Sequence, residues 1–179
     1  MKDINQETAA SISFPQAIAA TQYLINQIEA EKLEEEEIET QITALVSSKP
    51  GARGFFVAYL TSELSLADNP SVGVLNALKS SPDLVGELLV KNIAMSTAMT
   101  ITHQRNNDPE NSRNSATVAR RSINLAKQLD LDLITEELNQ LHQTLTTGEG
   151  SYQEFLNKWG YDAEQKEMIS KAIEQISQQ

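Results

Sequence analysis

The sequence contains no cysteine among its 179 residues, and it is also poor in aromatic residues, glycine and proline. The lack of thiols excludes a disulfide framework and any thiolate metal site, and it fits a reducing compartment. Aromatic residues make up only 5% of the chain, which has seven glycines and five prolines. The rest of the composition is dominated by Ala, Leu, Ile, Gln and Glu, a mixture typical of helices. It predicts an all-α fold.

Signals for export and for membrane insertion are missing as well. The first 15 residues have no basic start followed by an apolar run of signal-peptide length, so we expect a cytoplasmic protein. The longest apolar stretch, Leu84 to Thr102, is interrupted by Glu87, Lys91 and Asn92. A membrane span needs about 20 largely apolar residues. We therefore expect no membrane span.

The sequence also lacks an excess of basic over acidic side chains, since its net charge is −11. Residues 1–48 hold 2 basic and 9 acidic side chains, residues 49–128 hold 9 and 6, and residues 129–179 hold 3 and 10. Binding to a phosphate backbone requires clustered Lys and Arg without nearby acids. We expect no nucleic-acid partner, and we expect the acidic ends to pair with the basic middle.

Helix signals begin after residues 1–12, a polar stretch expected to be frayed or disordered. Ser13 is followed by Pro15 and Gln16, a pattern that caps a helix start. Similar signals predict about eight helices in one domain, residues 13–179, packed as a compact irregular bundle. The expected helices are 15–32, 34–46, 52–64, 70–79, 82–104, 115–129, 132–146, a short helix capped by Ser151 that ends at Gly160, and a last helix capped by Asp162.

The helix expected at 82–104 is mostly uncharged and should be central to the bundle. Its Asn92, Ser96, Thr100 and His103 lie together on the side opposite its charged residues. In a packing interpretation, the small residues of this helix let neighbours approach and its hydroxyls bond to backbone one turn back. In a ligand interpretation, the same four side chains line a small-molecule pocket.

Basic residues form a second candidate site around the loop expected at 106–112. Arg113, Arg120 and Lys127 recur every seven residues and so share one helix face, with Arg121 beside them and Arg105 before the loop. Arginine binds planar anions through two parallel hydrogen bonds. The cluster therefore predicts a site for an anion or an acidic partner, with the exposed loop 106–114 ordering on contact. The alternative is that acids of the same chain pair with these arginines.

Two aromatic clusters are candidates for a protein interface, since aromatic anchors are enriched at interfaces. Ordinary core packing is the alternative for both. The clusters are Phe55, Phe56 and Tyr59, and Tyr152, Phe155, Trp159 and Tyr161.

Catalytic and metal-binding motifs are lacking. His103 and His142 are the only histidines, no Glu-x-x-His pair occurs, and Gly51 to Gly54 is too short for a phosphate-binding loop. We therefore expect no catalytic residue, cofactor or metal. The leading hypothesis is a non-catalytic interaction or regulatory module that binds another protein and forms a homodimer. The alternative is a small-molecule or anion sensor, or an enzyme without a familiar motif, that uses the polar stripe of the central helix.

Overall fold

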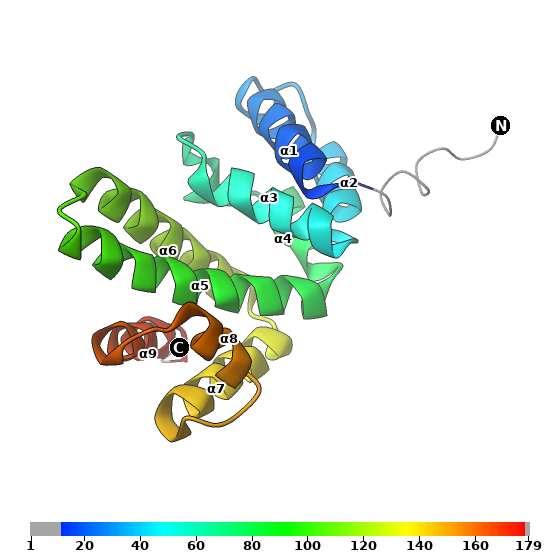
Figure 1. The fold of residues 1–179 in the computed structure, drawn as a ribbon. Helices are drawn as coiled ribbons and strands as arrows, with labels where there is room; N and C mark the ends of the chain where they lie inside the picture. Colours follow the sequence, from blue (N-terminus) through cyan, green and yellow to red (C-terminus); the bar gives the residue numbers. More distant parts are fainter. Residues whose placement is uncertain (1–11, 178–179) are drawn as a thin grey trace. The chain divides into compact units, whose positions relative to one another are not determined.

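A computed structural model describes residues 12–177, and the all-α fold predicted from composition is confirmed there. Within these residues the chain forms nine α-helices, one short 3-10 helix and no strand (Figure 1). The helices are α1 (Phe14–Glu29), α2 (Glu35–Val46), α3 (Lys49–Thr61), the 3-10 helix η2 (Ser65–Ala67), α4 (Val72–Lys79), α5 (Pro82–Arg105), α6 (Pro109–Leu129), α7 (Asp132–Thr147), α8 (Gln153–Trp159) and α9 (Ala163–Ser177).

The helices fall into two compact units whose boundary lies inside α5, after Leu88. Unit 1 contains α1 to α4 with the first turns of α5, and unit 2 contains the rest of α5 with α6 to α9. The expectation of a single domain over residues 13–179 stays a prediction. Disorder was expected for residues 1–12. Residues 1–11 lie outside the described residues.

In unit 1, α1 and α3 pack so closely that α3 needs a glycine at the contact. A Cβ at Gly54 would lie 2.5 Å from the Cβ of Ala17 and 2.9 Å from the backbone nitrogen of Ile18. Real Cβ atoms essentially never approach another heavy atom this closely. Beside this contact, the guanidinium of Arg53 lies 5.1 Å from the centre of the Phe14 ring. α1 is therefore held against α3 along its inner face.

The start of α2 also fixes the start of α4. The Glu35 carboxylate accepts hydrogen bonds from the backbone N–H of Gly73, at 2.6 Å, and from the hydroxyl of Ser71, at 2.8 Å. These groups lie in the first turn of α4, where N–H groups lack partners within the helix. Gly73 is needed here because a Cβ would lie 2.5 Å from the carbonyl oxygen of Glu35. Glu35, from the run of four glutamates at 34–37, thus contributes a specific cap to α4.

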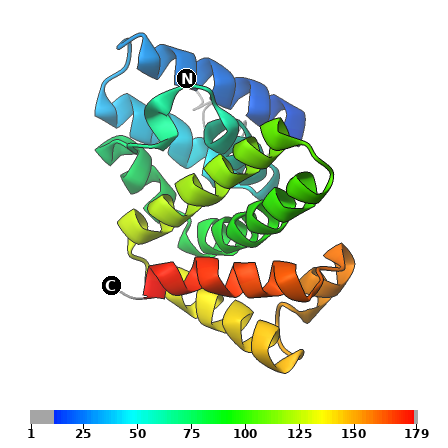
Figure 2. The same cartoon turned by 90° about the vertical axis from the view of Figure 1, so that its left-hand side faces the viewer.

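Unit 2 is built around α5 and α6, which run side by side and are joined by a short turn (Figure 1). The Ser112 hydroxyl of α6 donates to the carbonyl of Thr100 in α5 at 3.3 Å. α9 packs on both α6 and α7, and Figure 2 shows it lying along α7. Buried apolar side chains of these helices form the core of the unit: Ile93, Ala94, Ala98, Leu125, Leu129, Ile134, Leu138, Leu141, Ile169 and Ile173.

Two helix starts were predicted too late in the sequence. α6 begins at Pro109 instead of residue 115, so the loop expected at 106–112 or 106–114 is only a short turn. The Asp108 carboxylate caps this helix by accepting from the backbone N–H of Asn111 at 3.1 Å. α3 begins at Lys49 instead of residue 52, capped by Ser48. Proline lies in the first turn of both helices, a position that suits it because its missing N–H needs no partner there.

Two further helix caps differ from the expectation, whereas the caps at Ser13, Gly160 and Asp162 are confirmed. α4 begins at Val72 instead of Pro70, because Ser71 is its cap. Ser151 does not cap α8; its hydroxyl donates to Gln140 at 2.7 Å. The Ser13 capping box is confirmed, and so is the left-handed Gly160 that ends α8. The confirmed caps have the regular spacing that sequence patterns detect.

The close contact of α1 and α3 makes Gly54→Ala a test of the packing of unit 1. We expect it to lower the free energy of unfolding by about 1–2 kcal/mol, since overpacking costs about 1–3 kcal/mol and helix propensity returns up to about 1. Thermal unfolding measures the change. Adding Ala17→Gly should restore only part of the loss, because backbone atoms of Phe14 and Ile18 also block the new Cβ. A stabilised Gly54→Ala protein would contradict this packing.

Candidate functional site

The hydroxyls of the polar stripe on α5 bond to the backbone of their own helix. The Ser96 hydroxyl donates to the carbonyl of Asn92 at 2.5 Å, and the Thr100 hydroxyl donates to the carbonyl of Ser96 at 2.9 Å. Ser96 is buried and Thr100 is half-buried. This is the arrangement that the packing interpretation requires, because each hydroxyl enters the interior with its donor satisfied.

The two larger residues of the stripe do not add an unsatisfied polar group. Asn92 is half-buried, and the Nδ1 of His103 lies 3.7 Å from a carboxylate oxygen of Asp108 in the turn to α6. Across residues 12–177, no buried side-chain nitrogen or oxygen lacks a hydrogen-bond partner. The stripe therefore needs no ligand to satisfy its polar groups. A ligand bound by Asn92, Ser96, Thr100 and His103 stays a prediction.

A buried glutamine completes the polar interior of unit 2. The Gln165 amide nitrogen donates to the carbonyl of Ala98 at 3.2 Å and to the hydroxyl of Thr102 at 3.0 Å. Its amide oxygen accepts from the backbone N–H of Asp162 at 3.0 Å, and the Asp162 carboxylate accepts from the backbone N–H of Gln165. Gln165 thus caps α9 and ties that cap to α5. The capping pattern was visible in the sequence, whereas the contact with α5 was not.

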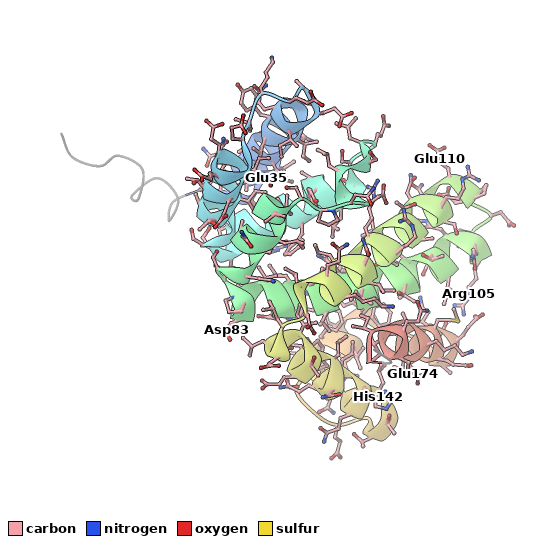
Figure 3. All side chains as sticks on the ribbon, turned by 180° about the vertical axis from the view of Figure 1, so that it is seen from behind. Glu35, Asp83, Arg105, Glu110, His142 and Glu174 are labelled. Atoms are coloured by element: carbon pink, nitrogen blue, oxygen red, sulfur yellow. The ribbon has the colours of Figure 1, made fainter. Side chains whose placement is uncertain are left out.

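Arg105, which Figure 3 labels at the end of α5, binds the acidic start of α9. Its two terminal nitrogens lie 2.5 and 3.4 Å from the carboxylate oxygens of Asp162, and one of them also binds Glu164. The hydrogen bonds that Arg105 donates to Asp162, and then those to Glu164, raise the pKa of Arg105 above its ordinary value. The Arg105 guanidinium in turn lowers the pKa of the Asp162 carboxyl. Arg105 was predicted for an external anion; acids of its own chain occupy it instead.

The other arginines of the predicted anion site differ in exposure. Arg113 and Arg120 are exposed on α6, whereas Arg121 is only 5% exposed and belongs to the interior. Glu110 and Arg105 mark the neighbouring ends of α6 and α5 in Figure 3. The internal pairing proposed from the charge distribution is thus confirmed for Arg105. An anion site formed by Arg105, Arg113, Arg120 and Arg121 together is not supported, because Arg105 is paired and Arg121 is buried.

The first aromatic cluster is core packing and not a surface anchor. Phe55, Phe56 and Tyr59 are at most 2% exposed. The ring centres of Phe55 and Phe56 are 5.5 Å apart, edge to face, and Phe55 stacks on Tyr59 at 5.0 Å. Rings packed in this way stabilise a core. The predicted interface role of these three residues is therefore corrected.

The second aromatic cluster divides between core and surface. Tyr152 and Tyr161 are buried, and burial raises the pKa of Tyr161 to about 12. Phe155 is half-buried between Tyr161, with ring centres 6.3 Å apart, and Lys91, whose Nζ lies 5.8 Å from the ring centre. Trp159 is 47% exposed at the end of α8. Of the predicted aromatic anchors, Trp159 is the one that the surface presents prominently.

Unit 1 has an open, polar groove that the sequence patterns did not indicate. It lies between α1 and the end of α3 and has a volume of about 500 Å³. Such a volume falls in the range of small-molecule sites, but this groove is lined mainly by polar groups and is not enclosed. Its lining residues are Gln22, Ile25, Asn26, Ala58, Thr61, Ser62, Glu63 and Leu64.

Two further features bear on metal binding and on membrane insertion: the grouping of possible metal ligands and the apolar length of α5. No group of three His, Cys, Asp or Glu side chains suited to a metal ion occurs in the described part of the chain. α5 is long and apolar enough to cross a membrane by length and composition, but half of its most apolar stretch is buried inside the fold. Core helices of soluble proteins meet the same criteria, so the expectation of no membrane span stays a prediction.

The buried amide of Gln165 gives a direct test of the polar interior. Gln165→Met keeps the side-chain length but leaves the N–H of Asp162 without its acceptor, so we expect a loss of about 1–3 kcal/mol in the free energy of unfolding. Gln143→Met, at an exposed position of α7, is the control and should change little. Urea unfolding measures both. Equal stability of the two variants would show that the Gln165 hydrogen bonds contribute nothing.

The ion pair of Arg105 predicts a pH-dependent contribution to stability. Pairing lowers the pKa of Asp162 in the folded state below its ordinary value of 3.8. Its contribution is therefore complete above about pH 4 and disappears as the pH falls through the lowered pKa. We expect Arg105→Gln to lower the melting temperature slightly at pH 7, and the difference from wild type to shrink as the pH falls below about 4. Arg113→Gln is the control; a loss equal to that of Arg105→Gln at pH 7 would contradict the assignment.

Comparison with known proteins places the chain in a family. No curated protein and no solved structure gives a significant match. A family described as "Uncharacterised conserved protein UCP020893" matches residues 13–176. The match begins at the cap of α1 and ends inside α9, so it takes in helices of both units. The chain belongs to this family of uncharacterised conserved proteins.

Proposed function

We propose that the chain is a non-catalytic, all-α interaction module with a regulatory role, which binds another protein. The observation that carries the proposal is the exposure of Trp159, at 47%, whereas Tyr152 and Tyr161 of the same aromatic cluster are buried. Tryptophan is the side chain with the most area to bury, and it is enriched among residues that dominate binding energy at interfaces. Leaving it exposed at a helix end favours a surface that a partner covers.

The surroundings of Trp159 support an interface. The ring follows the last turn of α8, and Gly160 ends that helix in a left-handed conformation, so the position of Trp159 is set by a defined cap. Its helix carries a shallow depression lined by Gln153, Glu154, Asn157 and Lys158. A polar rim beside an aromatic anchor is the usual anatomy of a protein–protein interface.

The distribution of charge and histidine supports the non-catalytic part of the proposal. His103 lies near the end of α5, where its Nδ1 is 3.7 Å from a carboxylate oxygen of Asp108. His142 is exposed on α7 (Figure 3). The net charge of −11 disfavours binding to a nucleic acid, since phosphates would be repelled. The proposed setting is the cytoplasm, with a protein partner and no cofactor.

Trp159→Ala tests the proposal by affinity capture from native extract. We expect the wild-type chain to recover a specific partner and Trp159→Ala to lose it, with at least a tenfold weaker affinity, because truncating a dominant anchor costs about 2 kcal/mol or more. Met168→Ala is the matched control, since Met168 lies in the same unit and is 41% exposed. Capture that is unchanged in Trp159→Ala, or reduced equally in both variants, would contradict the role of Trp159.

A further inference from the structure

We propose that two copies of the chain associate through the exposed face of α1. The inference goes beyond the proposed function and gives a surface to the homodimer that the sequence led us to expect. This surface belongs to unit 1 and is separate in sequence from the Trp159 surface. Two properties of α1 carry it: its exposed face has almost no charge, and its large and small side chains complement each other when the helix is paired with itself in reverse.

The lack of charge on α1 is unusual for this chain. Among the described exposed residues of α1, Glu29 is the one with a charge, and it is the last residue of the helix. The other exposed positions are Pro15, Gln16, Ala19, Ala20, Gln22, Tyr23 and Asn26. α9, of similar length, exposes Glu164, Glu167, Lys171 and Glu174 instead. Charged residues are depleted at the centres of interfaces, and in this respect the exposed face of α1 resembles a covered surface.

The most exposed apolar side chain on this face is Tyr23, at 66%. Ala19 lies one turn before it and Ala20 beside it, and both are exposed. Alanine side chains let a second helix approach closely, and a tyrosine ring supplies a large contact area at a low cost in conformational entropy. In an antiparallel pair centred at the level of Thr21, Tyr23 of each copy packs against the alanines of the other.

The inner face of α1 is already packed against α3, which fixes the position of the outer face. Thr21 is fully buried, with its hydroxyl bonded to the carbonyl of Ala17 at 2.7 Å, and Gly54 brings α3 against the same side of the helix. The outer residues are therefore presented by a helix that is already packed. Less conformational entropy is lost when a preorganised surface binds.

Electrostatics decide in favour of a second copy as the partner. Each copy carries a net charge of −11, so two copies repel each other except through a face without charge. A different protein would ordinarily be selected by charges complementary to its own, and the exposed face of α1 offers only Glu29, its last residue, for that purpose. An isologous contact needs only a surface that complements itself.

The size of the face sets the expected strength of the dimer. A helix of 16 residues is about 24 Å long, so α1 alone covers less than the roughly 800 Å² per partner of a standard interface. We expect a reversible dimer that dissociates in the micromolar range. Sedimentation equilibrium of the full chain, from low to high micromolar concentration, should show the mass rising from 19.8 kDa toward twice that value.

Tyr23→Lys is the decisive variant, and Val72→Lys is its matched control. Both positions are 66% exposed in unit 1, and both substitutions make the net charge less negative by the same amount. General charge repulsion is therefore reduced equally in the two proteins. We expect Tyr23→Lys to weaken dimerisation at least tenfold and Val72→Lys to leave it as in wild type, with equal melting temperatures. Trp159→Ala should also dimerise normally, so failure of the proposed function and failure of this inference are distinguishable.

A mixed sample tests the antiparallel arrangement. Ala19→Glu alone should be monomeric, whereas Ala19→Glu mixed with Tyr23→Lys should associate, because the new charges face each other across the pair. A wild type that is monomeric at high micromolar concentration overturns the inference, as does a dimer that Tyr23→Lys leaves unchanged. A monomeric wild type whose captured partner is lost in Tyr23→Lys assigns the face to a different protein, and likewise overturns it.

Discussion

The side-chain amide of Gln165 is the group on which the interior of unit 2 depends. It joins the cap of α9 to the carbonyl of Ala98 and the hydroxyl of Thr102, so the start of one helix is fixed against the middle of another. An amide placed in a core is costly unless its donors and its acceptor are all paired. Because the pairing is complete here, α5 can carry polar side chains inward without binding a ligand.

The contact between α5 and the start of α9 also contains an ion pair. Arg105 extends from α5 to the acidic start of α9, one turn beyond the contact of Gln165 with Thr102. Its partners lie among the acids near the C-terminal end of the chain, so part of the basic middle is neutralised within unit 2. Pairs this exposed add little stability. Their main consequence is that Arg105 is no longer available to an external anion.

Helix limits and caps could largely be predicted from the sequence, whereas contacts between residues distant in the sequence could not. The limits of α5 and the caps Ser13 and Gly160 were predictable because they depend on neighbouring residues. The early start of α6 was missed although Asp108 and Pro109 form a regular start signal, because the following Asn and Ser residues favour turns.

The candidate sites were hard to predict for the same reason. Whether a side chain is buried depends on neighbours that are distant in the sequence. Phe55 and Trp159 belong to similar aromatic clusters, yet one is in the core and the other is on the surface. The contact of Glu35 with Gly73, 38 residues apart, had no local signal at all. The lack of charge in α1 can be seen in the sequence. Whether this uncharged surface could bind another molecule depends on which of its residues are exposed, and only the structure shows that.

Native-state hydrogen exchange of α5 tests most directly the claim that its polar stripe is part of the packed interior. If Ser96, Thr100, Thr102 and Gln165 are satisfied within the fold, the amides of residues 93–102 should exchange only when the whole of unit 2 unfolds, as slowly as any in that unit. Exchange of these amides through local opening, as fast as in the turn at 106–108, would contradict the account and would favour a helix whose polar face opens to admit a ligand.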